Sequence, residues 1–292
     1  MERVVIFGSG YHGRAAYRKL KNNSNCKVLC FIDNGKEKEH SYFDDVEIYS
    51  PRKIKELLFD KIVITGRYTK EQSSQVINDL GISKSKLWLM SKEDIMPSSH
   101  ELSAKEELIY YALTKFVEII KKGGVEYWLD YSSLLAVVRG DLFSVYSDVD
   151  IAMTSQEDAK KLWNLLTTTD SFRNYELAKY ICKEKTSLFK IGDILKITII
   201  SKSVANEEPA TIDLHINSRH GNNIYMASDL GYFHHSPDVH FSDFDTILYK
   251  ELSLRIPIKL NEYLMHIYGH SWKKPVANWS NSGYMNISKG LL

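Results

Sequence analysis

The feature that most constrains this chain is a glycine-rich turn between a short apolar run and a helical stretch near the N-terminus. RVVIFG leads into GSGYHG at residues 8–13, and HGRAAYRKLKNN follows. Glycines permit a tight turn, and a helix that begins there presents free backbone N–H groups to an anion. We therefore predict that Gly8, Gly10 and Gly13 bind a phosphate, with Asp33, about 20 residues on, as the ribose-binding acid.

The rest of the first hundred residues repeats this alternation of strand and helix. CKVLCFID and KIVITG are short apolar runs, typical of strands buried on both faces of a parallel sheet. TKEQSSQVINDLG is typical of a helix that ends at Gly81. The alternation predicts a Rossmann-like α/β domain over residues 1–95.

Two interpretations of the glycine turn stay open. In the first, the turn binds an NAD-type dinucleotide. In the second, it only packs a helix against a strand. The second is favoured because the domain has room for roughly four or five strands, and no residue suited to hydride transfer follows the motif.

A polar segment at about residues 91–101 breaks the alternation and marks a linker. The second domain is predicted to cover residues 98–292. It opens with a long amphipathic helix, for which Ser103 and Glu106 form a predicted capping box. Short strands, helices and the alternating run ATIDLHIN follow, so we expect an α+β domain.

Composition limits the classes of function. The chain has 38 Lys and Arg against 37 Asp and Glu, a formal net charge of +1, so nucleic-acid binding over a broad basic surface is not expected. Three cysteines without a CxxC pair argue against a disulfide framework or a structural zinc site. We see no signal peptide and no membrane-spanning run, so we expect a cytoplasmic protein, with peripheral access to lipid-linked precursors left open.

Two aspartates, Asp148 and Asp150, stand one residue apart at the start of the run VDIAM. Residues i and i+2 of a strand point to the same face, so the two carboxylates aim together. Asp213 lies in the later run TIDLHI, and three carboxylates converge if that strand lies beside the first. Such a cluster suits Mg²⁺ and metal-assisted phosphoryl chemistry. The alternative is a solvated loop face.

The segment YWLDYSSLLAVVRGD, continued by SDVDIAM, resembles the LicD/fukutin family of phosphotransferases. Leu134, Leu135 and Arg139 fall on positions of the family motif, and so do Asp148 and Asp150. TIDLHI is similar to the family's later Val-Asp-Ile-Phe segment, and YGHSWKKP is similar to its Tyr-Gly-x-x-Trp-x-x-Pro signature. The resemblance covers about residues 100–280 and implies a nucleotidyltransferase-type fold for the second domain.

The resemblance implies transfer of a phospho-alcohol from a CDP-type donor to a hydroxyl of a cell-surface glycan, in capsule or teichoic acid synthesis. It implies Mg²⁺ or Mn²⁺ bound by Asp148, Asp150 and Asp213, and Arg139 as the group that offsets phosphoryl charge. The implied substrate-binding residues are Ser132, Ser133, Tyr268 and Trp272. Ser132-Ser133 stands where the family has Gly-Thr or Gly-Ser, which leaves the donor open.

Two rival functions stay open. The first is a nucleotidyltransferase that uses the same metals, attacks a nucleoside triphosphate and releases pyrophosphate. The second is a non-catalytic regulatory protein that binds a nucleotide in its first domain and has a degenerate second domain. The departures at Ser132-Ser133 and over residues 143–146 keep the second rival in play.

Two aromatic features have simple structural interpretations. His234, His235 and His240 lack the regular ligand spacing of a zinc site, so a surface loop is favoured for them. Tyr268 and Trp272 have rings that can stack on a base or a sugar, but packing in the core is favoured for Trp272.

Overall fold

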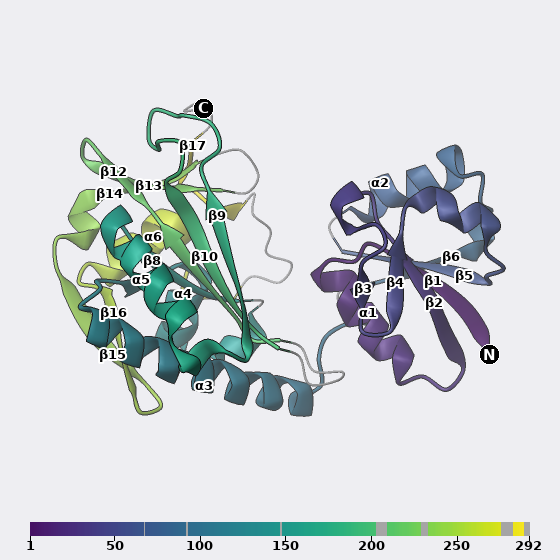
Figure 1. The fold of residues 1–292 in the computed structure, drawn as a ribbon, viewed down its shortest axis with the longest axis horizontal. Coiled ribbons are helices and arrows are strands. Elements are labelled where there is room, and N and C mark those ends of the chain that lie inside the picture. The colour runs from purple at the N-terminus through teal and green to yellow at the C-terminus, as the bar shows by residue number, and fades with distance from the viewer. Residues whose placement is uncertain are drawn as a thin grey trace. The chain divides into compact units, whose positions relative to one another are not determined.

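The computed structural model describes residues 1–66, 68–91, 93–146, 148–202, 209–228, 233–275 and 283–288. The chain divides into two compact units: Met1–Glu101, and the part from Leu102 on (Figure 1). Each hydrophobic cluster of the described residues lies within one unit.

A six-stranded sheet forms the first unit, in the spatial order β3-β4-β2-β1-β5-β6 (Figure 1). The strands are β1 (Glu2–Phe7), β2 (Cys26–Ile32), β3 (Tyr42–Phe43), β4 (Val46–Tyr49), β5 (Lys61–Thr65) and β6 (Leu87–Met90). All neighbours pair in parallel except β3 with β4. The chain passes from β1 to β2 on one side and later returns to β5 on the other side, so the strand order reverses between β1 and β5.

Both faces of this sheet are covered, as the continuous apolar runs predict. The covering helices are α1 (Tyr11–Lys21) and α2 (Thr69–Ser74), the latter continued by a π-helical turn (Gln75–Asp79). Val4 and Ile6 of β1 pack with Tyr17 of α1, whereas Val5 and Phe7 pack with Val76 on the other face. The predicted Rossmann-like parallel α/β domain is therefore confirmed.

The second unit has a mixed five-stranded sheet in the order β7-β8-β11-β10-β9. These strands are β7 (Trp128–Leu129), β8 (Val149–Met153), β9 (Tyr175–Ile181), β10 (Ile194–Ser201) and β11 (Thr211–Ile216). β8 and β11 are parallel, and the other pairs are antiparallel. The unit is α+β as expected.

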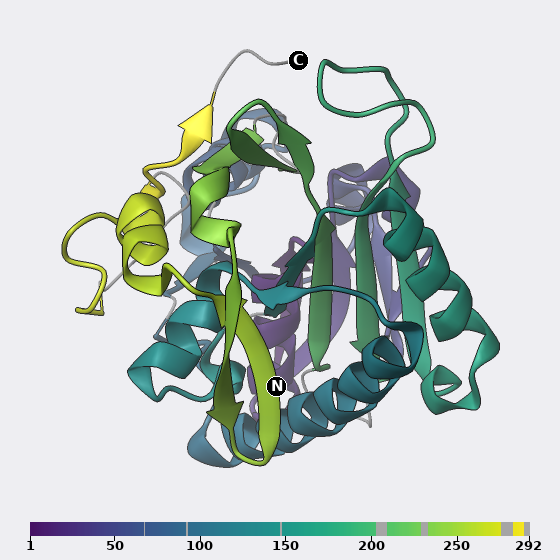
Figure 2. The same ribbon diagram turned by 90° about the vertical axis from the view of Figure 1, so that its left-hand side faces the viewer.

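Among the described residues, two small sheets and four helices complete the second unit, and the β15–β16 hairpin lies at its front in Figure 2. The remaining strands are β12 (Ser218–His220), β13 (Asn223–Ala227), β14 (Phe233–Pro237), β15 (Phe244–Tyr249), β16 (Leu252–Pro257) and β17 (Ile287–Ser288). The helices are α3 (Ser99–Gly123), α4 (Tyr131–Arg139), α5 (Gln156–Thr168) and α6 (Leu260–Tyr268).

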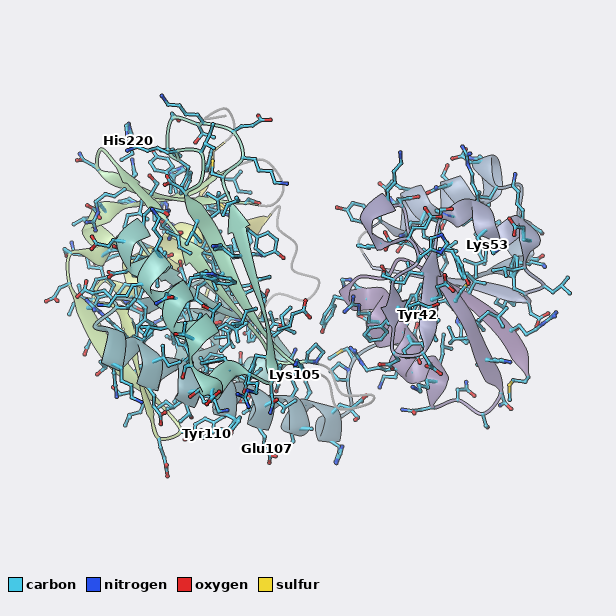
Figure 3. All side chains as sticks on the ribbon, viewed as in Figure 1. Tyr42, Lys53, Lys105, Glu107, Tyr110 and His220 are labelled. Atoms are coloured by element: carbon cyan, nitrogen blue, oxygen red, sulfur yellow. The ribbon has the colours of Figure 1, made fainter. Side chains whose placement is uncertain are left out.

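Helix α3 begins four residues before its predicted capping box. Ser98 and Glu101 cap it reciprocally, because each backbone N–H donates to the other's side chain. Glu106 is instead buried and accepts the backbone N–H of Ser144. In Figure 3, Lys105 and Glu107 point to different sides of α3, and Lys105 donates to the carbonyl of Tyr146 at 2.8 Å. Of the helices in the described ranges, α3 included, none has the length and apolar character that crossing a bilayer takes.

The predicted histidine loop is wrong. His234 and His235 belong to β14, and His240 lies in a short 3₁₀ turn, Asp238–Phe241. His234 and His240 are buried, because the rings pack against the tyrosines of α4 and α6. Trp272 lies in the main core of the second unit, in agreement with its favoured interpretation.

Candidate functional site

A cavity of about 570 Å³ lies at the carboxyl ends of three neighbouring strands of the first unit. Phe7 ends β1, Asp33 follows β2, and Thr65 ends β5, and all three line the cavity. This is the point at which the strand order reverses. Ligands of open parallel α/β sheets bind at such a switch point.

The three glycines of the first turn have different surroundings. Gly8 has φ +97°, a conformation that side-chain-bearing residues rarely adopt. A Cβ atom on Gly13 would lie 1.8 Å from the carbonyl oxygen of Gly8, so this glycine lets α1 pack closely on the turn. A Cβ atom on Gly10 would meet nothing within 4 Å. The backbone at Gly10 is therefore open to a ligand.

The N-terminus of α1 suits an anion. Gly10 is the N-cap residue, and among the described residues no side chain caps the helix and its first turn carries no acid. The first backbone N–H groups of a helix have no intrahelical partner and carry partial positive charge. Gly10, Tyr11 and Gly13 all line the cavity. This geometry suits a phosphate, and the binding of one by these glycines stays a prediction.

Asp33 is bound mainly by its own domain. Its carboxylate accepts the backbone N–H and the hydroxyl of Ser9 at 2.7 Å each, the backbone N–H of Gly35 at 2.9 Å and the ammonium of Lys38 at 3.3 Å. Burial raises the pKa of Asp33, but the Ser9 and Gly35 hydrogen bonds and the Lys38 charge outweigh it, so its pKa lies below its ordinary value. A carboxylate has about four acceptor sites. Asp33 therefore braces the turn and keeps little capacity for a ribose.

Two polar side chains of this cavity were missed from the sequence. Thr65 Oγ1 and Gln72 Oε1 are buried and lack a hydrogen-bond partner among the described residues, and both residues line the cavity. The only signal in the sequence was Thr65, which stands just before the glycine that ends KIVITG. Whether a buried polar atom lacks a hydrogen-bond partner is decided only by the folded structure, so the sequence alone does not reveal it.

In the second unit, Asp150 and Asp213 are register partners on the parallel strands β8 and β11, so they lie side by side. Asp150 accepts the hydroxyl of Ser132 at 2.7 Å, and its other oxygen lies 3.5 Å from Nε2 of His215. Asp213 accepts the hydroxyl of Thr198 at 2.6 Å and the ammonium of Lys196 at 3.3 Å. The sequence predicted that these two strands lie side by side, but it did not single out Lys196.

The expected three-carboxylate metal site is not supported. Within the described part of the chain, no three His, Cys, Asp or Glu side chains are placed to hold one metal ion. Asp148 precedes β8, Asp213 already pairs with the ammonium of Lys196, and Asp150 lies beside the imidazole of His215. Burial lowers the pKa of His215, but the hydrogen bond and charge of Asp150 and the charge of Asp213 outweigh it, so its pKa is raised. The donor set therefore does not fit Mg²⁺ or Mn²⁺ as it stands.

The remaining predicted residues have structural partners. Arg139, at the end of α4, donates to the backbone carbonyls of Trp272 and Lys274. The hydroxyl of Ser133 is buried and accepts the backbone N–H of Asp150 at 2.6 Å. Tyr268 is partly buried and packs against the same core as Trp272. Arg139 thus fastens the segment after α6 to α4.

Asp130 is a buried acid that the sequence did not single out. It is 0% exposed, and its Oδ1 accepts the backbone N–H of Tyr131 at 2.9 Å and the hydroxyl of Tyr263. Its Oδ2 has no partner among the described residues. Burial, with the charge of Asp150 in support, raises the pKa of Asp130 to about 6, even though the two hydrogen bonds lower it.

Comparisons with known proteins give one family model, and its match lies in the first unit. A family model described as "C2185-like, N-terminal" matches residues 1–88. No curated protein matches the sequence. Among solved structures, UDP-D-quinovosamine 4-dehydrogenase from Vibrio fischeri is 18% identical, with a TM-score of 0.27 over 35% of this chain and 84% of that one.

Two further solved structures match over longer stretches. A NAD-binding protein from Listeria innocua is 11% identical, with a TM-score of 0.26 over 88% of this chain and 81% of that one. A myo-inositol dehydrogenase from Corynebacterium glutamicum is 11% identical, with a TM-score of 0.26 over 94% of this chain and 85% of that one. Scores this low carry no statement about activity.

The resemblance to LicD/fukutin phosphotransferases is therefore corrected. The family model that matches is C2185-like over residues 1–88, and no curated protein, LicD phosphotransferases included, matches the sequence. Transfer of a phospho-alcohol from a CDP-type donor, and the LicD enzyme class, are wrong as predictions. The two rival functions do not depend on that resemblance and stay untested predictions. The CDP-alcohol and glycan partners rest on that resemblance alone and are not carried further.

Proposed function

We propose that the first unit binds a nucleotide in the switch-point cavity, with the phosphates on the turn of residues 8–13 and the start of α1. The observation that carries the proposal is the open face of Gly10 at an uncapped helix N-terminus inside a cavity of about 570 Å³. A phosphate there gains hydrogen bonds from backbone N–H groups that otherwise have no partner.

An NAD-type dinucleotide belongs to this ligand class. Its pyrophosphate matches the glycine turn, and Rossmann-type sheets bind such ligands at the point where the strand order reverses. The strand order of the first unit supports this choice. Because the carboxylate of Asp33 already accepts four hydrogen bonds, three of them on Oδ2, we expect other residues to contribute to recognition of the ribose.

Titration calorimetry of the full chain with NAD⁺, NADH, ADP and UDP tests the proposal. The decisive variant is Gly10→Ala, because its methyl group has room in the free protein and would compete with the proposed phosphate for that space. We expect an unchanged thermal midpoint and an affinity at least about tenfold weaker, equivalent to about 1.4 kcal/mol. Ser24→Ala, an exposed substitution outside the cavity, is the control. Wild-type affinity in Gly10→Ala, or no binding of any of the four ligands, rejects the proposal.

For the second unit, we propose a nucleotidyltransferase-type fold with a polar site around Asp150 and Asp213. The support is their side-by-side placement on parallel strands, with the Ser132 hydroxyl at 2.7 Å from Asp150. Asp148 and Arg139 stay predictions as members of this site. Comparison of an experimental structure with nucleotidyltransferases, strand by strand, tests the fold.

A cytoplasmic location is also a proposal. Cys26, Cys30 and Cys182 are free thiols, and burial raises the pKa of Cys30 to about 12. Unpaired thiols of this kind are common where the surroundings are reducing. Cell fractionation of the tagged full chain tests it.

A further inference from the structure

We infer that this cavity recognises a hydroxylated sugar ring attached to the phosphates, through Thr65 and Gln72. The inference rests on the proposed nucleotide binding and names the part of the ligand that β5 and α2 contact. It also moves sugar recognition from Asp33, where the sequence motif places it, to the opposite side of the glycine turn.

The first observation is that two buried polar atoms of the cavity wall lack partners among the described residues. Thr65 is 6% exposed, and its Oγ1 at the end of β5 has none. Oε1 of Gln72, on α2, is likewise buried and has none. Leaving a buried polar group unsatisfied costs about 1–3 kcal/mol each. A ligand that satisfies both atoms recovers this cost on binding.

The second observation places Gln72 beside the phosphate turn. Nε2 of Gln72 lies 3.3 Å from the position that a Cβ atom would take on Gly8. The amide therefore reaches across the glycine that shapes the turn. A group bound by Gln72 is then a direct neighbour of a phosphate bound at residues 8–13.

The chemistry of the orphaned atoms selects the ligand group. Oε1 of Gln72 is an acceptor only, so it needs a donor from the ligand. The oxygens of an ionised phosphate accept hydrogen bonds but have no proton to donate, so the phosphate itself cannot satisfy Oε1 of Gln72. A hydroxyl group both donates and accepts. Neighbouring ring hydroxyls can donate to Gln72 and accept from the hydroxyl of Thr65.

Among the other polar side chains of the cavity wall, those of Asp33, Asn34 and Gln75 are engaged, whereas those of Tyr68 and Glu71 are exposed. Asn34 and Gln75 bond each other reciprocally, with N···O distances of 3.0 and 2.9 Å between their amides. The carboxylate of Asp33 has four donors of its own, from Ser9, Gly35 and Lys38. Among the described buried side-chain atoms of the cavity wall, the unused hydrogen-bonding capacity therefore lies with Thr65 and Gln72.

The test compares matched ligands that differ only by a sugar. We titrate the full chain with ADP and ADP-ribose, and with UDP and UDP-glucose, because the structure does not select a base. In at least one pair, the sugar-bearing ligand should bind about tenfold more tightly, the effect of about 1.4 kcal/mol. Thr65→Val and Gln72→Met should each remove that gain and leave the affinity for the plain diphosphate unchanged.

Thr65→Val carries a second readout that a merely structural residue would not give. Valine has the shape of threonine without the hydroxyl, so it removes an unsatisfied polar atom from the free protein. The thermal midpoint of the free variant should therefore stay or rise while its sugar-dependent affinity falls. Asn78→Ala, on the same helical segment but outside the cavity wall, is the control and should change neither quantity.

The outcomes separate this inference from the proposal beneath it. If neither ADP nor UDP binds, with or without its sugar, the proposed nucleotide binding fails. If a diphosphate binds but its sugar adds nothing, or both variants weaken the plain diphosphate equally, only the sugar inference is overturned. NAD⁺ is a further arm. An affinity gain from ADP-ribose to NAD⁺ that Thr65→Val and Gln72→Met abolish would assign these residues to a carboxamide and overturn the sugar.

Discussion

Gly10 and Gly13 stand three residues apart in one turn, yet a methyl group meets different surroundings at each. On Gly13 it would lie 1.8 Å from the Gly8 carbonyl oxygen, so the backbone must shift. We expect Gly13→Ala to destabilise the first unit by about 3 kcal/mol or more, at the upper end of overpacking costs. Urea unfolding measures the change, with Gly10→Ala as the matched control. Equal stability of the two variants would show that the turn relaxes easily.

Asp130 makes stability depend on pH. Its pKa is about 6 in the folded protein against 3.8 ordinarily, so between these values the folded state binds a proton that the unfolded state has lost. Stability of the second unit must then fall as pH rises from about 4 to 6, by on the order of 3 kcal/mol. Asp130→Asn keeps Oδ1 as an acceptor for Tyr131 and Tyr263 and has no proton to lose.

We therefore expect Asp130→Asn to flatten the pH profile over that window and to exceed the wild type in stability at pH 7. Unfolding midpoints in urea between pH 4 and 8 measure both effects. His215 has a raised pKa, so it stabilises at low pH, and that contribution is lost as pH rises above 6.5. A wild-type profile retained in Asp130→Asn would assign the acid-side stability to other groups.

One mostly buried charge pair links the neighbouring strands β10 and β11. The side chains of Lys196 and Asp213 are 14% and 11% exposed, with Nζ and Oδ2 3.3 Å apart. Removing one partner of a mostly buried pair leaves an uncompensated charge, which costs several kcal/mol, whereas removing both costs much less. We expect Lys196→Met to destabilise by about 3 kcal/mol and the double variant with Asp213→Asn to recover most of this.

A double-mutant cycle in guanidinium chloride at constant pH measures the coupling. The single variant Asp213→Asn completes the cycle and shows what Lys196 alone costs. Additive effects of the two substitutions would mean that the pair is solvated and does not stabilise the strands.

Local sequence patterns predict the elements and the pairing of some strands, but they do not predict contacts that only the folded chain sets. The continuous apolar runs were enough for a sheet covered on both faces, and TIDLHI was enough to pair Asp213 with Asp150. Lys196 came from a strand whose register only folding sets. The S-x-x-E pattern occurs at both Ser98 and Ser103, and burial of Glu106 against Ser144 decided between them. Thr65 and Gln72 stayed hidden because no pattern encodes a missing partner.

At the scale of the whole molecule, the hydrophobic clusters of the described residues respect one boundary. Two clusters draw only on residues 4–95, and the other two only on residues 108–284. Separate cores of this kind can unfold in separate steps, so a single unfolding free energy need not describe the chain. The linker was predicted over about residues 91–101 because polar and proline residues interrupt an otherwise regular alternation, but helix α3 already begins at Ser99.

Nucleotide binding should stabilise the unit on only one side of this boundary. A ligand that binds only the folded first unit at 100 times its dissociation constant stabilises that unit by about 2.7 kcal/mol and leaves the second unit unchanged. We expect two transitions in calorimetry, of which ADP-ribose or UDP-glucose raises only one. That transition should be the one that Gly13→Ala lowers. Tryptophan fluorescence supports the assignment, because the first unit has Trp88 alone.

Separate fragments give the matching control. Residues 1–101 should fold by themselves and bind the nucleotide with the affinity of the full chain, since both clusters that build their core lie within them. Residues 102–292 should show no shift with the same ligand. Two outcomes would contradict this prediction. One is a nucleotide that raises both transitions equally. The other is a first fragment that folds but does not bind the nucleotide.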